Sequence, residues 1–168
     1  MAKDVAYLVD PDSSPVAIKI VGRASFMNVA PLKAFLKGSI GSGVVKFVVD
    51  FSECDGMDST VLGILAGTAL QLRRKKPAGS IVLCRLDARN LSSIKSLGLH
   101  RIATLDQGQQ CMNLGAVQES LDGSKLDELE NARMCLEAHE NLVEADEGNR
   151  SKFQNVIDLM QNRVDEAR

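Results

Sequence analysis

The sequence predicts an α/β domain followed by a helical tail. From residue 44 onward, apolar β-branched segments alternate with amphipathic helical patterns, as in parallel strands joined by crossover helices. Segment 44–49 is almost continuously apolar, the pattern of a central strand covered on both faces. Residues 1–118 carry 14 Lys and Arg against 9 Asp and Glu, whereas residues 119–168 carry 6 against 13. This change in charge predicts two parts with different surfaces.

The elements of the domain follow from hydrophobic periodicity and from turn residues. Strands are predicted at 5–9, 16–21, 44–49, 80–84 and 100–104. Helices are predicted at 28–38, 59–76 and 88–96. Gly22 is expected to end the second strand, and a polar turn is expected between residue 50 and the helix at 59. Pro77 and Gly98 are expected to stop the second and third helices.

The tail is predicted to be a hairpin of two antiparallel helices, 124–145 and 150–165, separated by a break at Gly148. Ser124, with Asp127 three residues on, gives a weak capping signal. Two helices of this size bury too little surface to be stable alone. They are expected to pack on the domain, on a second copy or on a partner, with apolar residues buried. These residues are Leu129, Leu136, Val143, Phe153, Ile157 and Met160.

The composition is that of an ordinary soluble protein, with 45% hydrophobic and 25% charged residues. Aromatic residues are 4% and Trp is absent, which removes the stacking platforms of a single-strand nucleic-acid binder. No apolar run reaches the roughly 18 residues of a membrane span, and residues 1–5 do not resemble a signal peptide, so a cytoplasmic location is expected. The four Cys match neither a zinc site nor a small disulfide scaffold, and Cys84 is expected to be a buried hydrophobic residue.

No motif of catalysis, metal binding or cofactor binding is present, and neither an enzyme nor a cofactor is predicted. His139 lies between acidic residues and is expected on the surface. A triad of Ser59, His100 and Asp58 has no Gly-x-Ser-x-Gly elbow to support it. Asp55 and Asp58 are explained by a capping turn without acid–base work. The glycines at 38–43 lack the Lys-Ser/Thr of a phosphate loop.

The basic run 73–76 leaves two interpretations open. It could form a nucleic-acid patch. At the end of a helix it is more simply a set of cations that complement the helix dipole. We expect no direct nucleic-acid or membrane partner.

The junction at residues 58–60 is the most informative feature of the chain. Asp58-Ser59-Thr60 joins a buried strand to an apolar helix, and Asp or Ser at such a place caps the first turn of the helix. A hydroxyl there is held rigidly at the positive end of the helix dipole. If Ser59 were phosphorylated, the amides and the dipole would favour the added charge.

Residues 48–65, with their Asp58-Ser59-x-x-Leu62-Gly63 core, resemble the STAS family of anti-sigma factor antagonists and their relatives. Segments 18–22 and 80–84 are similar to the second and fourth strands of that family, and 86–105 to its closing helix and strand. The resemblance covers residues 3–108. It implies a mixed β-sheet with helices packed largely on one face. It also divides the chain into a STAS-like domain at 1–108, a linker at 109–123 and a hairpin at 124–168.

The resemblance also implies a function, a phosphorylation-controlled protein-interaction module in a partner-switching pathway. Ser59 corresponds to the serine that a kinase, itself an anti-sigma factor, phosphorylates and that a phosphatase resets. Asp58, Ser59, Thr60 and Gly63 are then the expected partner-binding residues.

Two departures from the family pattern keep a second interpretation open. Val61 replaces the usual Gly, and segment 22–25 lacks the expected acidic residue. These changes, together with the extra tail, are also compatible with a structural scaffold that is not phosphorylated. For either function the tail helices are expected to pack in cis or to form a homodimer, and the sequence leaves both open.

Overall fold

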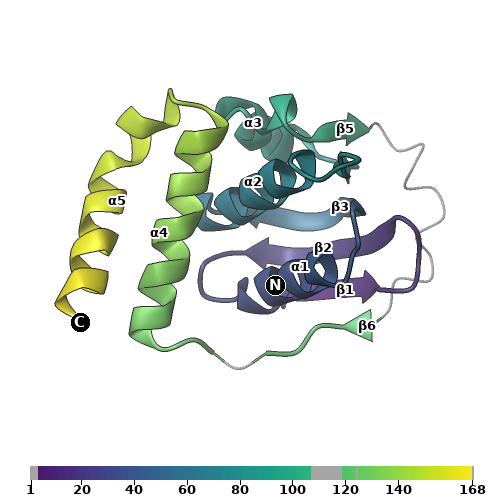
Figure 1. Cartoon of the computed structure of the whole chain (residues 1–168). Coiled ribbons are helices and arrows are strands. Elements are labelled where there is room, and N and C mark those ends of the chain that lie inside the picture. Colours follow the sequence, from purple (N-terminus) through teal and green to yellow (C-terminus); the bar gives the residue numbers. More distant parts are fainter. Residues whose placement is uncertain (1–3, 107–118, 124, 168) are drawn as a thin grey trace.

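The computed structural model describes residues 4–106, 119–123 and 125–167. A six-stranded sheet with strand order β5-β4-β3-β2-β1-β6 forms its centre (Figure 1). The strands are β1 (Ala6–Asp10), β2 (Val16–Ala24), β3 (Lys46–Met57), β4 (Ser80–Cys84), β5 (Thr104–Asp106) and β6 (Glu119–Ser120). The helices are α1 (Ala30–Gly41), α2 (Ser59–Arg73), α3 (Ala88–Ser96), α4 (Glu128–Ala145) and α5 (Asn149–Glu166), with a 3-10 turn η1 at Leu99–Arg101.

The sheet is mixed. The pairs β2–β3, β3–β4 and β4–β5 are parallel, because a helical crossover joins the two strands of each pair. Strand β1 pairs antiparallel with β2, and β6 pairs antiparallel with β1. The predicted α/β class and the mixed sheet are both confirmed.

The main core lies between the sheet and the helices. Phe47, Val49 and Phe51 alternate along β3 and share this core with apolar residues of the first three helices, as period-two alternation requires. Those helix residues include Leu32, Leu36, Leu65, Leu72 and Ile94. Val48 points to the opposite face of the sheet, where it packs with Ala17, Val82 and Cys84. The helices thus cover one face of the sheet, and the site described below lies on their side.

Several predicted boundaries are wrong. Helix α1 runs to Gly41 instead of ending at 38, and α2 ends at Arg73 instead of 76. Strand β3 does not end at residue 49 but runs to Met57, through the predicted polar turn. Strand β2 continues past Gly22, which takes φ 82° beside a register shift in the pairing with β3. The predicted strand at 100–104 is largely the η1 turn, so only Thr104 onward pairs with the sheet.

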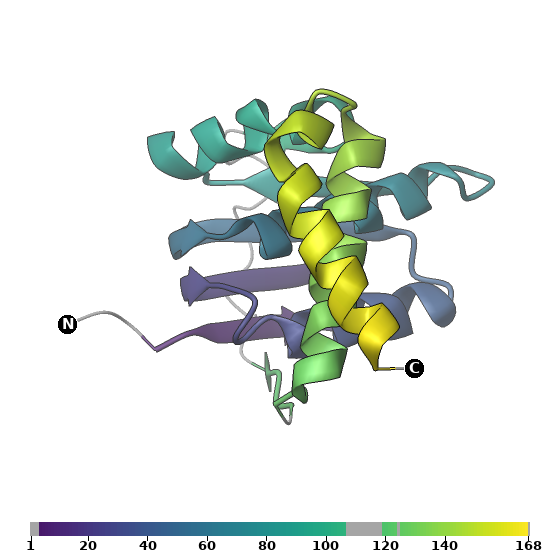
Figure 2. The same cartoon turned by 90° about the vertical axis from the view of Figure 1, so that its left-hand side faces the viewer.

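The tail forms the two predicted helices and packs on the domain within the same chain. Helix α4 lies between α5 and the domain, as Figures 1 and 2 show from two directions. Met134, Ala138 and Leu142 of α4 join the main core, whereas Ala132 and Leu136 pack with Val164 of α5. Of the six apolar residues expected to be buried, Leu136 and Val143 are buried and the other four are partly buried.

The start of the hairpin differs from the prediction. Helix α4 begins at Glu128, and Asp127 rather than Ser124 caps it, in a box with Glu130. Strand β6 lies within the predicted linker 109–123, most of which falls outside the described residues. The linker's limits therefore stay a prediction.

The cysteines differ in state. Cys84 is fully buried, as expected. Cys54 and Cys135 are free thiols. Burial raises the pKa of both free thiols, which favours the protonated, unreactive form.

Candidate functional site

Ser59 is the first residue of α2, directly after the residue that caps this helix. The side chain of Asp58 accepts a hydrogen bond from the Val61 N–H at 3.0 Å with one oxygen and from the Phe26 N–H at 2.8 Å with the other. The Asp58 N–H donates to Ala24 O. Asp58 thus joins the end of β2, the loop after it and the start of α2. The backbone at Ser59 is fixed as the sequence predicted.

The Ser59 hydroxyl forms a hydrogen bond with a histidine of the tail. Its Oγ lies 2.8 Å from Nε2 of His139 on α4. The other ring nitrogen, Nδ1, lies 2.7 Å from the carbonyl oxygen of Cys135, which can only accept a hydrogen bond. Nδ1 therefore carries a proton. In the neutral ring Nε2 is then an acceptor, and Ser59 donates to it.

His139 is not on the surface, so that expectation is wrong. Only 2% of its surface is exposed, and its ring packs edge-on against Phe153 of α5 with centroids 5.0 Å apart. The acidic neighbours in sequence point elsewhere because Glu137 and Glu140 lie on other sides of the helix, where both are exposed. The signal for burial was the spacing of His139 with Cys135, Ala138 and Leu142 on one helical face.

Thr60 and Gly63 also lie against α4. Thr60 is buried, and its hydroxyl donates to the Cys135 sulfur at 3.7 Å. Gly63 allows the closest approach of the two helices: a Cβ on it would lie 2.1 Å from the backbone oxygen of Ala138. Its own carbonyl accepts a hydrogen bond from the Asn141 side chain at 3.2 Å. The structure brings all four predicted partner-binding residues together and places Thr60 and Gly63 beneath the tail.

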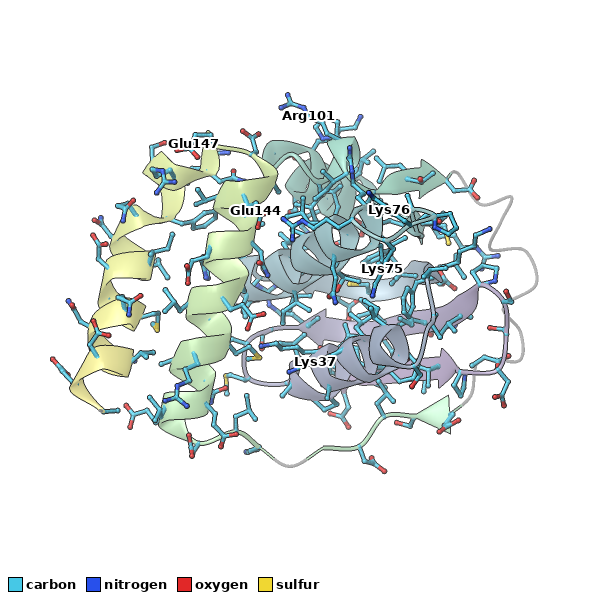
Figure 3. The ribbon with its side chains drawn as sticks, viewed as in Figure 1. Lys37, Lys75, Lys76, Arg101, Glu144 and Glu147 are labelled. Carbon is cyan, nitrogen blue, oxygen red and sulfur yellow. The ribbon has the colours of Figure 1, made fainter. Side chains whose placement is uncertain are left out.

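Charged pairs surround this helix crossing. Lys33 pairs with Glu137 at 2.9 Å, Arg74 pairs with Glu144, and Arg101 lies 3.7 Å from Asp146. Figure 3 shows Glu144 on the edge of α4 that faces the domain, whereas Glu147 lies in the turn between α4 and α5. The acidic tail thus meets basic residues of the domain, and complementary charges of this kind favour one orientation of docking.

The basic run 73–76 begins at the last residue of α2, and two of its side chains contact other parts of the chain. Arg73 donates to the carbonyl of Arg101 at 2.9 Å, and Arg74 pairs with Glu144. Lys75 and Lys76 follow the end of α2 and are exposed. Half of the run therefore has a structural role.

The triad of Ser59, His100 and Asp58 does not form, because the histidine beside Ser59 is His139, whereas His100 lies in the η1 turn. Asp58 bonds to backbone amides, and His139 is oriented by a backbone carbonyl, so no carboxylate positions the histidine. Among residues 4–106, 119–123 and 125–167 no three His, Cys, Asp or Glu side chains come together as metal ligands. Within the same ranges no helix is long and apolar enough to cross a membrane.

Two exposed apolar side chains lie beside Asp58 and were missed by sequence reasoning. Phe26 is 47% exposed and Met27 is 72% exposed, in the loop that the Asp58 carboxylate holds. The loop is further fixed by Asn28, which accepts hydrogen bonds from the Ser25 N–H and the Tyr7 hydroxyl. Large apolar residues exposed on a fixed loop are typical of a protein-binding surface.

The family model of the STAS domain matches residues 8–109. A search of the curated proteins finds no match. Among solved structures, an anti-sigma factor antagonist from Mycobacterium paratuberculosis is 22% identical, with a TM-score of 0.56 over 70% of this chain and 98% of that one.

The Bacillus cell fate determinant SpoIIAA in its phosphorylated form is 18% identical, with a TM-score of 0.52 over 64% of this chain and 97% of that one. The unphosphorylated form of SpoIIAA, described as an anti-sigma factor antagonist, gives the same identity and TM-score. At these identities the solved structures establish a shared fold. The family model spans most of the chain, which therefore belongs to the STAS domain family.

Proposed function

We propose that this protein is a non-enzymatic signalling module, similar to an anti-sigma factor antagonist, whose partner binding is controlled by phosphorylation of Ser59. The observation that carries the proposal is the place of the Ser59 hydroxyl, directly after the Asp58 cap at the positive end of α2. The exposed Phe26 and Met27 beside Asp58 provide an apolar contact surface next to it. A solved neighbour with this fold is a phosphorylated protein.

Phosphorylation would act through charge and volume. A phosphate adds about −1.5 to −2 charges at pH 7 and three strong acceptor oxygens. At Ser59 the first-turn amides of α2 favour that charge, whereas an acidic or apolar partner surface docked there would be repelled. The partners are then a serine kinase that acts as an anti-sigma factor and a phosphatase that resets the site, all in the cytoplasm. Asp58, Ser59, Thr60 and Gly63 are the proposed contacts.

The test is phosphopeptide mass spectrometry on protein isolated from its native cells. We expect phosphate on Ser59, none on the exposed Ser52 of β3, and none at position 59 in the Ser59→Ala variant. Phosphate at another residue only, or none in any growth condition, would contradict the proposal.

The hydrogen bond between Ser59 and His139 favours a second function, that of an assembly scaffold that is never phosphorylated. In that case the hydroxyl is a structural donor, and α4 covers it permanently. The Ser59→Asp variant separates the two functions when partners are co-purified from native cells. The switch predicts loss of a partner that the wild type retains, with the sheet intact by circular dichroism. The scaffold predicts the same partners for both proteins.

A further inference from the structure

The face of α2 that carries Ser59 has the composition of a helix-docking surface. Ser59, Gly63 and Gly67 are spaced four residues apart, so they form one stripe of small residues along the helix. A Cβ on Gly63 would lie 2.1 Å from the backbone of α4, and one on Gly67 would lie 2.3 Å from the Asn141 side chain. The stripe is thus fitted to a second helix at backbone distance.

Helix α4 occupies this stripe and engages the Ser59 hydroxyl. Ser59 Oγ is 2.8 Å from a ring nitrogen of His139, which is buried between α2 and Phe153 of α5. A phosphate on the side of Oγ that faces His139 would overlap the imidazole where α4 now lies. A kinase must also surround the serine and its flanking backbone. Ser59 is therefore closed to phosphate transfer while α4 is docked.

The tail helices form one unit, which packs on the domain through Met134, Ala138 and Leu142 of α4. Helices α4 and α5 keep an apolar contact of their own, in which Ala132 and Leu136 pack with Val164. The ion pairs between α4 and the domain have exposed or partly exposed partners, and such pairs stabilise a structure little. At the crossing itself, α4 presents the small residue Ala138.

We propose that the α2 stripe is the partner-docking surface, that α4 occupies it in place of the partner, and that Ser59 is phosphorylated only when α4 is released. The partner that fits is an amphipathic helix with a small residue at the place of Ala138 and an acceptor at the place of His139. This inference rests on the proposed function, because it assigns a control to the same serine.

The experiment measures access to position 59 without a kinase. In the Ser59→Cys background, a dye-bearing maleimide is the probe, and peptide mapping separates position 59 from the other cysteines. Ala138→Leu adds bulk where α4 meets Gly63 and leaves the α2 stripe unchanged, whereas Ala34→Leu adds the same bulk on an exposed side of α1. We expect labelling to become at least roughly tenfold faster with Ala138→Leu, since that corresponds to about 1.4 kcal/mol of lost docking, and to stay unchanged with Ala34→Leu.

A second variant changes the α2 side of the contact between α2 and α4, and it has its own control. Gly63→Ala places a methyl group into the backbone of α4, whereas Gly38→Ala on α1 meets nothing within 4 Å. Hydrogen exchange should show α4 and α5 less protected in Gly63→Ala only, with β3 still protected. Equal labelling in all proteins would overturn the inference. Loss of protection in β3 with both Ala138→Leu and Gly63→Ala would also overturn it, because the hairpin would then be inseparable from the fold.

Phosphate occupancy in native cells separates this inference from the proposed function. Higher occupancy of Ser59 in Ala138→Leu than in the wild type supports both. Equal, nonzero occupancy in the two proteins rejects the inference and keeps the function. Faster labelling together with no phosphate in either protein keeps α4 as a removable cover and rejects the function.

Discussion

Replacing Phe51 by alanine is expected to lower the free energy of unfolding by about 3–5 kcal/mol. Phe51 is 1% exposed and lies on β3 within the core that supports α2. Its removal leaves a cavity between the sheet and the helices that cannot fully collapse, so the lost packing contacts add to the free energy of transferring the side chain from water. Urea unfolding followed by circular dichroism measures the change as a shift in midpoint.

The control for this prediction is Phe26→Ala. Phe26 is 47% exposed, so the same substitution should change the midpoint little. If Phe51→Ala and Phe26→Ala shift the midpoint equally, the core assigned to β3 is not the one that stabilises the protein.

Replacing Asn149 by alanine is expected to loosen the hairpin, at a cost of about 1–3 kcal/mol. Asn149 is fully buried, and its amide donates to Leu97 O at 2.9 Å and to Leu142 O at 2.8 Å. It therefore joins the α4–α5 turn to the end of α3. The Leu142 carbonyl keeps the Asp146 N–H as a donor, so the penalty falls mainly on the buried Leu97 carbonyl.

Hydrogen exchange measures this effect locally. Amides of α4 and α5 should exchange faster in Asn149→Ala, while those of β3 keep their rates. Asn155→Ala is the matched control, because Asn155 is exposed on the same helix. Uniformly faster exchange across the sheet would show that Asn149 supports the whole domain and not the hairpin.

Much of the domain could be predicted from the sequence because its elements obey local rules. The run 44–49 and the helix after Asp58 combine hydrophobic period, β-branching and capping, which all favour the same structure. Where these signals do not agree, as at the end of β3, the predicted boundary is wrong. The polar residues after 49 suggested a turn, yet β3 continues there because β2 pairs with it as far as Met57.

The candidate site could be predicted only on the α2 side. Ser59 and its cap depend on neighbours in sequence, whereas His139 meets Ser59 across 80 positions of chain. Leu129, Leu136 and Val143 recur every seven residues and predict one apolar face of α4. That helix is buried on two sides, since Ala138 and Leu142 face α2 while Leu136 faces α5. A single apolar stripe cannot reveal a helix between two layers.

Strand β6 has a consequence for any protein that competes with α4. It pairs with β1 at Leu8 and Val9, and only residues 121–127 join it to α4. A released hairpin thus stays attached near its own site, at an effective concentration of about millimolar. If the hairpin is docked 99% of the time, the apparent dissociation constant of a competitor rises about 100-fold. A partner of modest intrinsic affinity would then bind only when something else shifts that balance, so the tether sets a threshold for the response.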